Sequence, residues 1–212
     1  MSMLSFNKYE KTKKLWQTKH RSDAYASGEN IEKNNKLSEA FIRRHLTAIQ
    51  NADTLLELGI GSGRNINILL KHMPETKYFG NDISPNVIAY IREAYPNVFA
   101  NCDITVKDTR AYVSQSPNVD VVFTHGHLMH LPEDVIGEVC KNISKIANHH
   151  ILIREAFTND VGVGFFRNLK YRRYRFDRDY SQMFPNFKLV DKVVTKHPKK
   201  NWVRQGEYLF SR

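Results

Sequence analysis

The sequence predicts a single α/β domain built around a mostly parallel sheet. Three observations support this fold class: a length of 212 residues, a composition with 41% hydrophobic residues, and the alternation of strand-like and helix-like segments over residues 54–153. Such alternation requires parallel strands joined by right-handed crossovers, with helices on both faces of the sheet. The last two expected strands have no full helix between them, so we expect an antiparallel hairpin at one edge.

The expected elements follow in chain order. Residues 1–35 form a basic, partly helical extension that we expect to cover the site, and residues 36–212 form the domain. Ser84 is expected to cap a helix that begins at Pro85. Apolar periodicity predicts helices at 37–49, 64–72, 85–93, 132–146 and 177–184, and strands at 54–58, 77–82, 97–102, 119–124, 150–154, 188–195 and 207–211.

The charge and composition narrow the classes of partner. The formal net charge is +10, which favours nucleic acid, an anionic membrane surface or a phosphorylated or carboxylated small molecule. No apolar run reaches the roughly 18 residues of a membrane span, and the Lys-rich start is not a signal peptide. Cys102 and Cys140 lack metal-site spacing, so we expect no metal and two free thiols in a reducing compartment. We therefore expect a cytoplasmic monomer or homodimer.

A glycine-rich loop and a later acidic residue predict a nucleoside-binding site. In Glu57-Leu58-Gly59-Ile60-Gly61-Ser62-Gly63-Arg64, the glycines let the backbone approach a ligand closely. Asp82 follows about 20 residues later, where a carboxylate can accept both hydroxyls of a ribose. A dinucleotide motif needs a glycine where Arg64 stands, and Glu57 suits an ammonium group better than a pyrophosphate. The pattern therefore favours a nucleoside with an amino-acid tail over NAD, and a glycine turn without ligand is the alternative.

On residues 57–63, 80–84 and 119–124 the sequence resembles the class I S-adenosylmethionine-dependent methyltransferases. The resemblance covers roughly residues 37–212 and implies a Rossmann-like sandwich with a seven-stranded sheet in the order 3-2-1-4-5-7-6. It also implies S-adenosyl-L-methionine as the cofactor. The residues that it assigns to the cofactor are Glu57, Gly59 and Gly61 for the methionine part, Asp82 for the ribose, and Ile83, Asp103 and Ile104 for the adenine. His125, which follows the fourth expected strand, is a candidate base that we expect to line the cofactor instead. For Asp103, the capping of a turn is the alternative.

A second resemblance concerns the acceptor. Residues 122–133, 151–155, 175–180 and 187–191, together with Leu15-Trp16, are similar to methylases associated with pseudaminic acid biosynthesis. This similarity implies a sugar or an activated sugar as the substrate.

Candidate catalytic residues follow the fourth and fifth expected strands. Methyl transfer from a sulfonium is a direct displacement, so the protein aligns the reactants and excludes water. A hydroxyl or protonated amine also needs a base. His130 and His127 are the candidates, with packing or loop stabilisation as the alternative. Glu155 is expected either to orient the acceptor or to pair with an arginine.

The basic and aromatic run at 165–176 is expected to form a lid over the acceptor or a solvated loop. Arginine forks bind phosphate or carboxylate and aromatic rings stack on sugars or bases. The substrate-binding candidates are Trp16, Tyr25, Tyr171, Arg172 and Arg173.

We therefore expect a methyltransferase that acts on a small anionic metabolite, a sugar or nucleotide-sugar hydroxyl or amine. A nucleic-acid methyltransferase is the alternative, because basic and aromatic residues alternate in the run at 165–176. Against it, residues 124–127 read Thr-His-Gly-His rather than the Asn/Asp-Pro-Pro-Tyr/Phe of base N-methylating enzymes. A non-catalytic binding module is the third hypothesis, and the intact glycine loop with Asp82 weighs against it.

Overall fold

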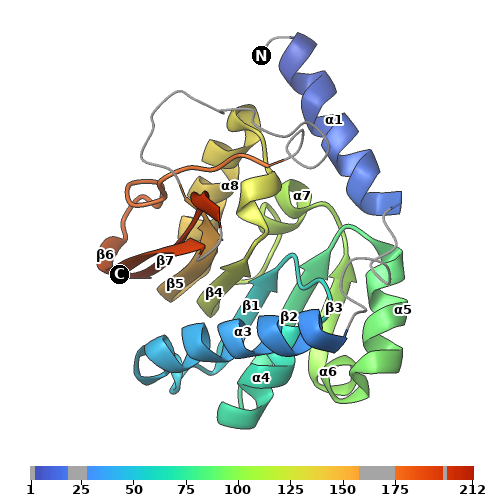
Figure 1. Cartoon of the computed structure of the whole chain (residues 1–212), viewed down its shortest axis with the longest axis vertical. Coiled ribbons are helices and arrows are strands. Elements are labelled where there is room, and N and C mark those ends of the chain that lie inside the picture. The colour runs from blue at the N-terminus through green and yellow to red at the C-terminus, as the bar shows by residue number, and fades with distance from the viewer. Residues whose placement is uncertain (1–2, 19–27, 158–174, 198–199) are drawn as a thin grey trace.

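The computed structural model describes residues 3–18, 28–157, 175–197 and 200–212. A seven-stranded sheet in the order β3-β2-β1-β4-β5-β7-β6 forms its centre (Figure 1). The first five strands pair in parallel, and the last two add an antiparallel hairpin at one edge. This confirms the predicted fold class and strand order. The strands are β1 (Thr54–Leu58), β2 (Lys77–Asp82), β3 (Cys102–Val106), β4 (Val119–His125), β5 (Ala147–Ala156), β6 (Lys188–His197) and β7 (Lys200–Ser211).

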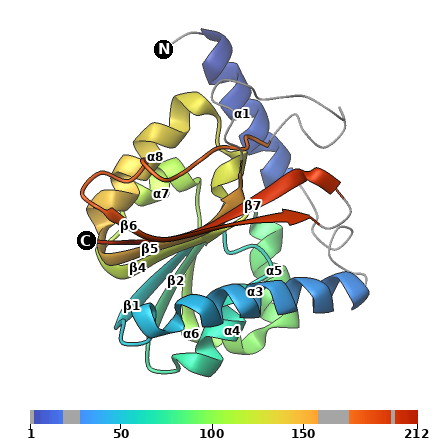
Figure 2. The same ribbon diagram turned by 60° about the vertical axis from the view of Figure 1, so that its left-hand side comes forward.

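Helices cover both faces of the sheet (Figure 2). One face carries α3 (Gly28–Ile49), α4 (Arg64–His72), α5 (Pro85–Ala94) and α6 (Pro96–Asn101), and the other carries α7 (Thr109–Val113) and α8 (Glu133–Ile146). A short 3-10 turn, η1 (Leu128–His130), joins β4 to α8. The N-terminal helix α1 (Met3–Thr18) lies beyond the carboxyl ends of the strands (Figure 1).

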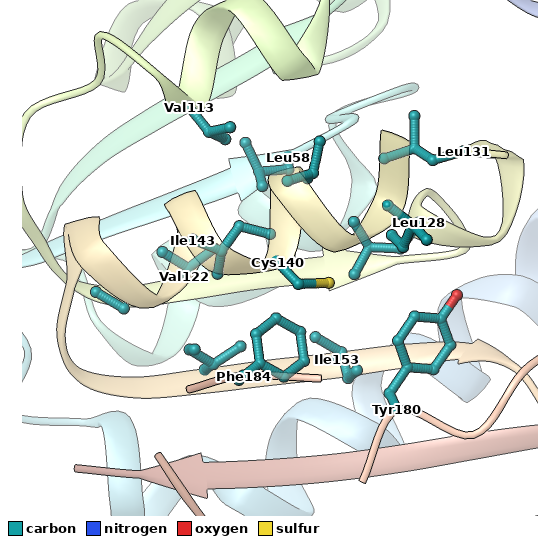
Figure 3. Packing of buried hydrophobic residues seen from close by; sticks show 14 of the residues in the cluster. Leu58, Val113, Val122, Leu128, Leu131, Cys140, Ile143, Ile153, Tyr180 and Phe184 are labelled. Atoms are coloured by element: carbon teal, nitrogen blue, oxygen red, sulfur yellow. The ribbon is translucent and has the colours of Figure 1, made fainter. Parts of the chain in front are cut away.

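Alternate residues of the central strands β1, β4 and β5 pack into two separate apolar cores. Leu56 and Leu58 of β1, with Ile153 of β5, pack on the side of α8 (Figure 3). Leu55 and Leu152 pack on the opposite side, with α3 and α4. Successive side chains of a strand point to opposite faces, so a strand that is apolar throughout belongs at the centre of a sheet covered on both sides.

The third strand is not where the sequence predicted it. The segment 97–102 was expected to be a strand, but Pro96 opens the single-turn helix α6 there and Val98 is fully buried. A proline suits the first turn of a helix because its missing N–H has no helical partner to bond. The strand β3 therefore begins at Cys102, and Asp103 and Ile104 are its second and third residues instead of following it.

Two further expectations differ from the structure. Residues 177–184 form turns rather than a helix: the Asp179 carboxylate accepts hydrogen bonds from the N–H and hydroxyl of Ser181, which competes with helix formation. The boundary expected after residue 35 falls inside α3, so one continuous helix joins the extension to the domain. In the described part of the chain, no helix has both the length and the apolar character to cross a membrane.

Candidate active site

A pocket lies at the carboxyl ends of β1, β2 and β4, between the sheet and α1. The strand order reverses between β1 and β4, and open α/β sheets bind ligands at such a point. We call one side the sheet wall; its residues include Gly59, Asp82, Ile83, Ser84 and Asp108. We call the other side the α1 wall; it consists of Tyr9, Thr12, Lys13 and Trp16 of α1 with His127, His130 and Leu131 of the segment that follows β4.

Asp82 ends β2, and its carboxylate is held from two sides. The backbone N–H of Gly61 donates to Oδ2 at 3.1 Å, and the N–H of Ser84 donates to Oδ1 at 3.0 Å. A carboxylate oxygen has capacity for about two hydrogen bonds, so each oxygen can accept one more. Gly61 itself does not line the pocket; it fixes Asp82 instead.

Ser84 occupies the expected position before α5, but its hydroxyl does not cap the helix. The side chain is 3% exposed and lines the pocket. Among the described residues its Oγ has no hydrogen-bond partner. Since a buried hydroxyl without a partner is unfavourable, this atom is suited to bind a polar group of a ligand. Ile83, between Asp82 and Ser84, adds an apolar surface to the same wall.

Gly59 lies directly against the imidazole ring of His127. Its φ is 68°, and a Cβ atom placed on it would be 2.2 Å from Nδ1 of that ring. Both the backbone conformation and the close contact therefore require glycine. The other ring nitrogen, Nε2, lies 2.8 Å from the hydroxyl of Thr109. His127 thus spans the pocket from the glycine loop to the start of α7.

The acidic residue that faces the pocket after β3 is Asp108, not Asp103. Asp103 is exposed near the start of β3, and neither it nor Ile104 lines the pocket. The adenine role expected for these two residues is therefore wrong, because the carboxyl end of β3 is Val106. Because the third strand was predicted at 97–102 instead of 102–106, Asp108 was not recognised as a residue that follows its carboxyl end. Its Oδ1 accepts a hydrogen bond from the N–H of Ala111 and caps α7, and this N-cap spacing is the sequence signal that could have revealed it.

One face of α1 closes the pocket. Tyr9, Thr12, Lys13 and Trp16 share that face because residues three and four apart are neighbours on a helix. The Tyr9 hydroxyl donates to Oδ2 of Asp108 at 2.5 Å. Burial, together with this bond, raises the pKa of Tyr9, so the phenol stays protonated and donates.

Trp16 meets His130 in the α1 wall. Their ring centroids are 4.5 Å apart with the planes inclined by 54°. The structure thus brings together two residues that the sequence proposed separately for the acceptor. The other substrate-binding candidates, Tyr25, Tyr171, Arg172 and Arg173, lie outside the described residues.

Glu155 does not reach the pocket, which corrects its expected catalytic role. The residue is completely buried, and its carboxylate accepts hydrogen bonds from the Thr124 hydroxyl and from three backbone N–H groups, at 2.9 to 3.1 Å. Burial raises the pKa of Glu155, while these bonds oppose the rise. Among the described residues, Glu155 also forms no ion pair with an arginine, which was the alternative expectation. Its partners belong to the loop that carries His127 and His130.

His125 and Glu57 lie in a polar chain behind the pocket rather than in its lining. Glu57 accepts from the Asn65 amide at 2.6 Å, and the Asn65 oxygen is 3.3 Å from Nδ1 of His125. Arg154 donates to Nε2 of His125 at 2.7 Å and to Glu207 at 3.0 Å. Burial, reinforced by nearby guanidinium groups, lowers the pKa of His125 well below its ordinary value. Since arginine can only donate, Nε2 accepts and the imidazole is neutral.

A family comparison agrees with this geometry. Residues 55–149 match a family model described as a methyltransferase domain. The matched residues make up just under half of the chain. The match runs from β1 into β5 and so includes the strands whose carboxyl ends form the sheet wall. With this match and its fold, the chain is an enzyme of the S-adenosylmethionine-dependent methyltransferase class.

Solved structures share the fold over most of the chain. The magnesium protoporphyrin IX methyltransferase of Synechocystis PCC 6803 is 12% identical with a TM-score of 0.67, and the match covers 99% of this chain and 95% of that one. The N-methyltransferase NodS of Bradyrhizobium japonicum WM9 is 14% identical with a TM-score of 0.66, and the match covers 97% of this chain and 98% of that one. The 1,6-didemethyltoxoflavin-N1-methyltransferase of Burkholderia thailandensis is 16% identical with a TM-score of 0.63, and the match covers 90% of this chain and 84% of that one. No curated protein sequence matches the chain.

Proposed function

We propose that this enzyme transfers a methyl group from S-adenosylmethionine to a small anionic acceptor bound against the α1 wall. One observation carries the proposal: a single pocket joins Asp82 and Ser84 at the strand ends to Trp16 and His130, whose rings are in contact. Small-molecule sites are typically concave and apolar with a few convergent polar groups.

The sheet wall fits the cofactor. Asp82 has free acceptor capacity for the ribose hydroxyls, and the buried Ser84 hydroxyl lies beside it without a partner in the described part of the chain. Ile83 offers the adenine an apolar contact, and Asp108 takes the place first given to Asp103. When bound, S-adenosylmethionine supplies the activated methyl group. The protein holds the nucleoside and excludes water.

The α1 wall supports the choice of acceptor. Lys13 lines the pocket, and its ion pair with Glu10 is long at 3.6 Å and only partly buried, so an anionic ligand can replace it. Trp16 offers a ring face to a sugar, and His130 beside it can take the acceptor's proton. The similarity to pseudaminic-acid-associated methylases supports a sugar or nucleotide sugar as the first class to test. Two of the solved structures named above are, by their descriptions, methyltransferases of small molecules, magnesium protoporphyrin IX and 1,6-didemethyltoxoflavin.

Calorimetric titration with S-adenosylhomocysteine tests the cofactor assignment. Asp82→Ala should weaken binding at least about tenfold, because a hydrogen bond to a charged group contributes about 1.5–3 kcal/mol. Asp103→Ala should bind as the wild type does, since that side chain is exposed at the start of β3. A wild-type protein that does not bind, or equal losses in the two variants, would contradict the assignment.

Transfer of labelled methyl groups tests the acceptor. The panel contains nucleotide sugars, free acidic sugars, neutral sugars and transfer RNA, each incubated with methyl-labelled S-adenosylmethionine and the full chain. We expect label in an anionic sugar derivative and none in the neutral sugars. Label in the RNA would establish the alternative function and reject the small acceptor.

A further inference from the structure

The loop between β4 and α8 supplies several pocket residues but is held by side chains outside the pocket. We call residues 126–131 the η1 loop; Gly126, His127, His130 and Leu131 line the pocket. Leu128 points the other way and is buried in the apolar core between Leu131 and Tyr180 (Figure 3). A turn this short leaves backbone N–H groups at its start and carbonyls at its end without partners inside the turn.

Glu155 binds the amino end of the η1 loop. Its Oε1 accepts from the N–H groups of His127 and Leu128 at 2.9 and 3.0 Å, and its Oε2 accepts from the N–H of Met129 at 3.1 Å. The Thr124 hydroxyl completes the set at 2.9 Å. Every one of these contacts is an acceptor contact for the carboxylate, which suits the ionised form and leaves no acceptor for a carboxylic proton.

Arg178 binds two carbonyls of the same loop: that of Leu131 at its carboxyl end, and that of Leu128, which also accepts from the N–H of Leu131. Its side chain is 9% exposed. Nη1 donates to the carbonyl of Leu128 at 3.2 Å, and Nη2 donates to that of Leu131 at 3.0 Å. Nη2 also donates to Glu133, the first residue of α8, at 2.6 Å. The planar guanidinium can hold two carbonyls and a carboxylate at once because its donors have fixed directions.

We propose that Glu155 and Arg178 are positioning residues that grip the η1 loop from its two ends and so fix His127 and His130 in the pocket. This inference deepens the proposed function, because it assigns the arrangement of the acceptor side to two buried charges that touch no ligand. The charges match the polarity of the turn: an anion at the end that presents N–H groups and a cation at the end that presents carbonyls.

The contact between Trp16 and His130 provides a readout that needs no ligand. The chain has two tryptophans, so Trp202→Phe leaves Trp16 as the sole tryptophan emitter. An imidazole in contact with an indole ring quenches the fluorescence of the indole. The emission of Trp16 therefore reports its contact with His130, and His130→Gln in the same background defines the unquenched level.

Glu155→Gln and Arg178→Gln in the Trp202→Phe background test the inference. Each should retain the circular dichroism of the fold and move Trp16 emission most of the way to the His130→Gln level. Each should also weaken S-adenosylhomocysteine binding on the order of tenfold, because His127 lies directly against Gly59 of the sheet wall. Folded variants that keep the wild-type quenching would overturn the proposal.

Two controls separate positioning from general destabilisation. Asp120→Asn removes a comparable carboxylate at the opposite end of β4, where Asp120 accepts from the N–H groups of Asp53 and Thr54. This variant should lose stability but keep the Trp16 signal. Arg175→Gln removes a nearby guanidinium that pairs with Asp177 instead of the loop, and it should also keep the signal. Loss of the signal in either control would contradict the proposal.

Milder variants decide the question if the first pair does not fold. Thr124→Val removes one of the four hydrogen bonds to Glu155. Arg178→Lys keeps the positive charge but loses the planar guanidinium that donates to several acceptors at once. Each should give a partial rise in Trp16 emission, and unchanged emission in both would reject the proposal. The fluorescence arm uses no cofactor, so a failure of the proposed function, seen as a wild type that does not bind S-adenosylhomocysteine, is distinguishable from a failure of this inference.

Discussion

The two walls of the pocket are assembled in different ways. In the sheet wall, Asp82 is fixed by Ser84, two residues away, and by Gly61, 21 residues away. In the α1 wall, Tyr9 bonds to a residue 99 positions later, and Arg178 bonds to a loop carbonyl 50 positions earlier. The cofactor side is therefore a property of two consecutive strand–loop–helix units, whereas the acceptor side needs the whole chain to fold. Variants in the two walls should fail in different assays.

The largest effect is expected from His130→Gln, which should separate transfer from cofactor binding. Loss of a positioned base lowers a rate by about 100-fold or more, while binding of S-adenosylhomocysteine should stay at the wild-type level because Asp82 is untouched. The measurements are the transfer rate to the acceptor found in the panel and calorimetric titration. His149→Gln, with a side chain 67% exposed on β5, is the matched control and should change neither. Equal losses of transfer and binding would remove the distinction between the walls.

Gly59→Ala should damage the sheet wall. An L-residue at positive φ costs about 1–2 kcal/mol, and the new methyl group must also displace His127. We expect S-adenosylhomocysteine affinity to fall about tenfold or more, measured by calorimetry. Gly137→Ala is the control: its Cβ meets nothing within 4 Å in α8, so it should raise the free energy of unfolding by about 0.5–1 kcal/mol and leave affinity intact.

The polar chain behind the pocket should make stability depend on pH. Burial lowers the pKa of His125 in the folded chain. Below the ordinary pKa of histidine, the unfolded chain therefore binds a proton at this residue that the folded chain does not bind. Stability is therefore complete above the unfolded value of about 6.5 and falls as the pH drops below it, by up to about 1.4 kcal/mol per pH unit for one proton. His125→Gln should flatten this slope in urea unfolding at several pH values, whereas His149→Gln should not. A wild type and His125→Gln with parallel pH profiles would contradict the neutral imidazole.

Tyr9→Phe should have the smallest effect and tests how firmly α1 is held. It removes one hydrogen bond, to Asp108, and leaves the bond from Ala111 in place. We expect a loss of about 0.5–1.5 kcal/mol in the free energy of unfolding, measured by urea denaturation. Tyr90→Phe, on α5, is the control for removal of a phenol. A change no larger than that of the control would mean that α1 is held by packing alone.

The predictions that came true rest on local patterns. The alternation of strands and helices, the glycine loop and the edge hairpin follow from periodicity and from turn residues close together in the chain. The third strand was misplaced because Val98 and Phe99 suit a buried strand and a buried helix turn equally well. Pro96 ahead of them was the helix signal that decided between the two.

The sequence by itself determined the order of elements and the position of Asp82 at the end of β2, and it predicts a nucleoside-binding site there. Only the tertiary structure decided that Glu155 turns inward to the η1 loop, that Asp108 faces the pocket, and that Trp16 lies against His130. The physical reason is the separation along the chain of the residues that interact. Periodicity records which face of an element is buried, but which distant groups satisfy a buried charge depends on contacts that form once the whole sheet is assembled.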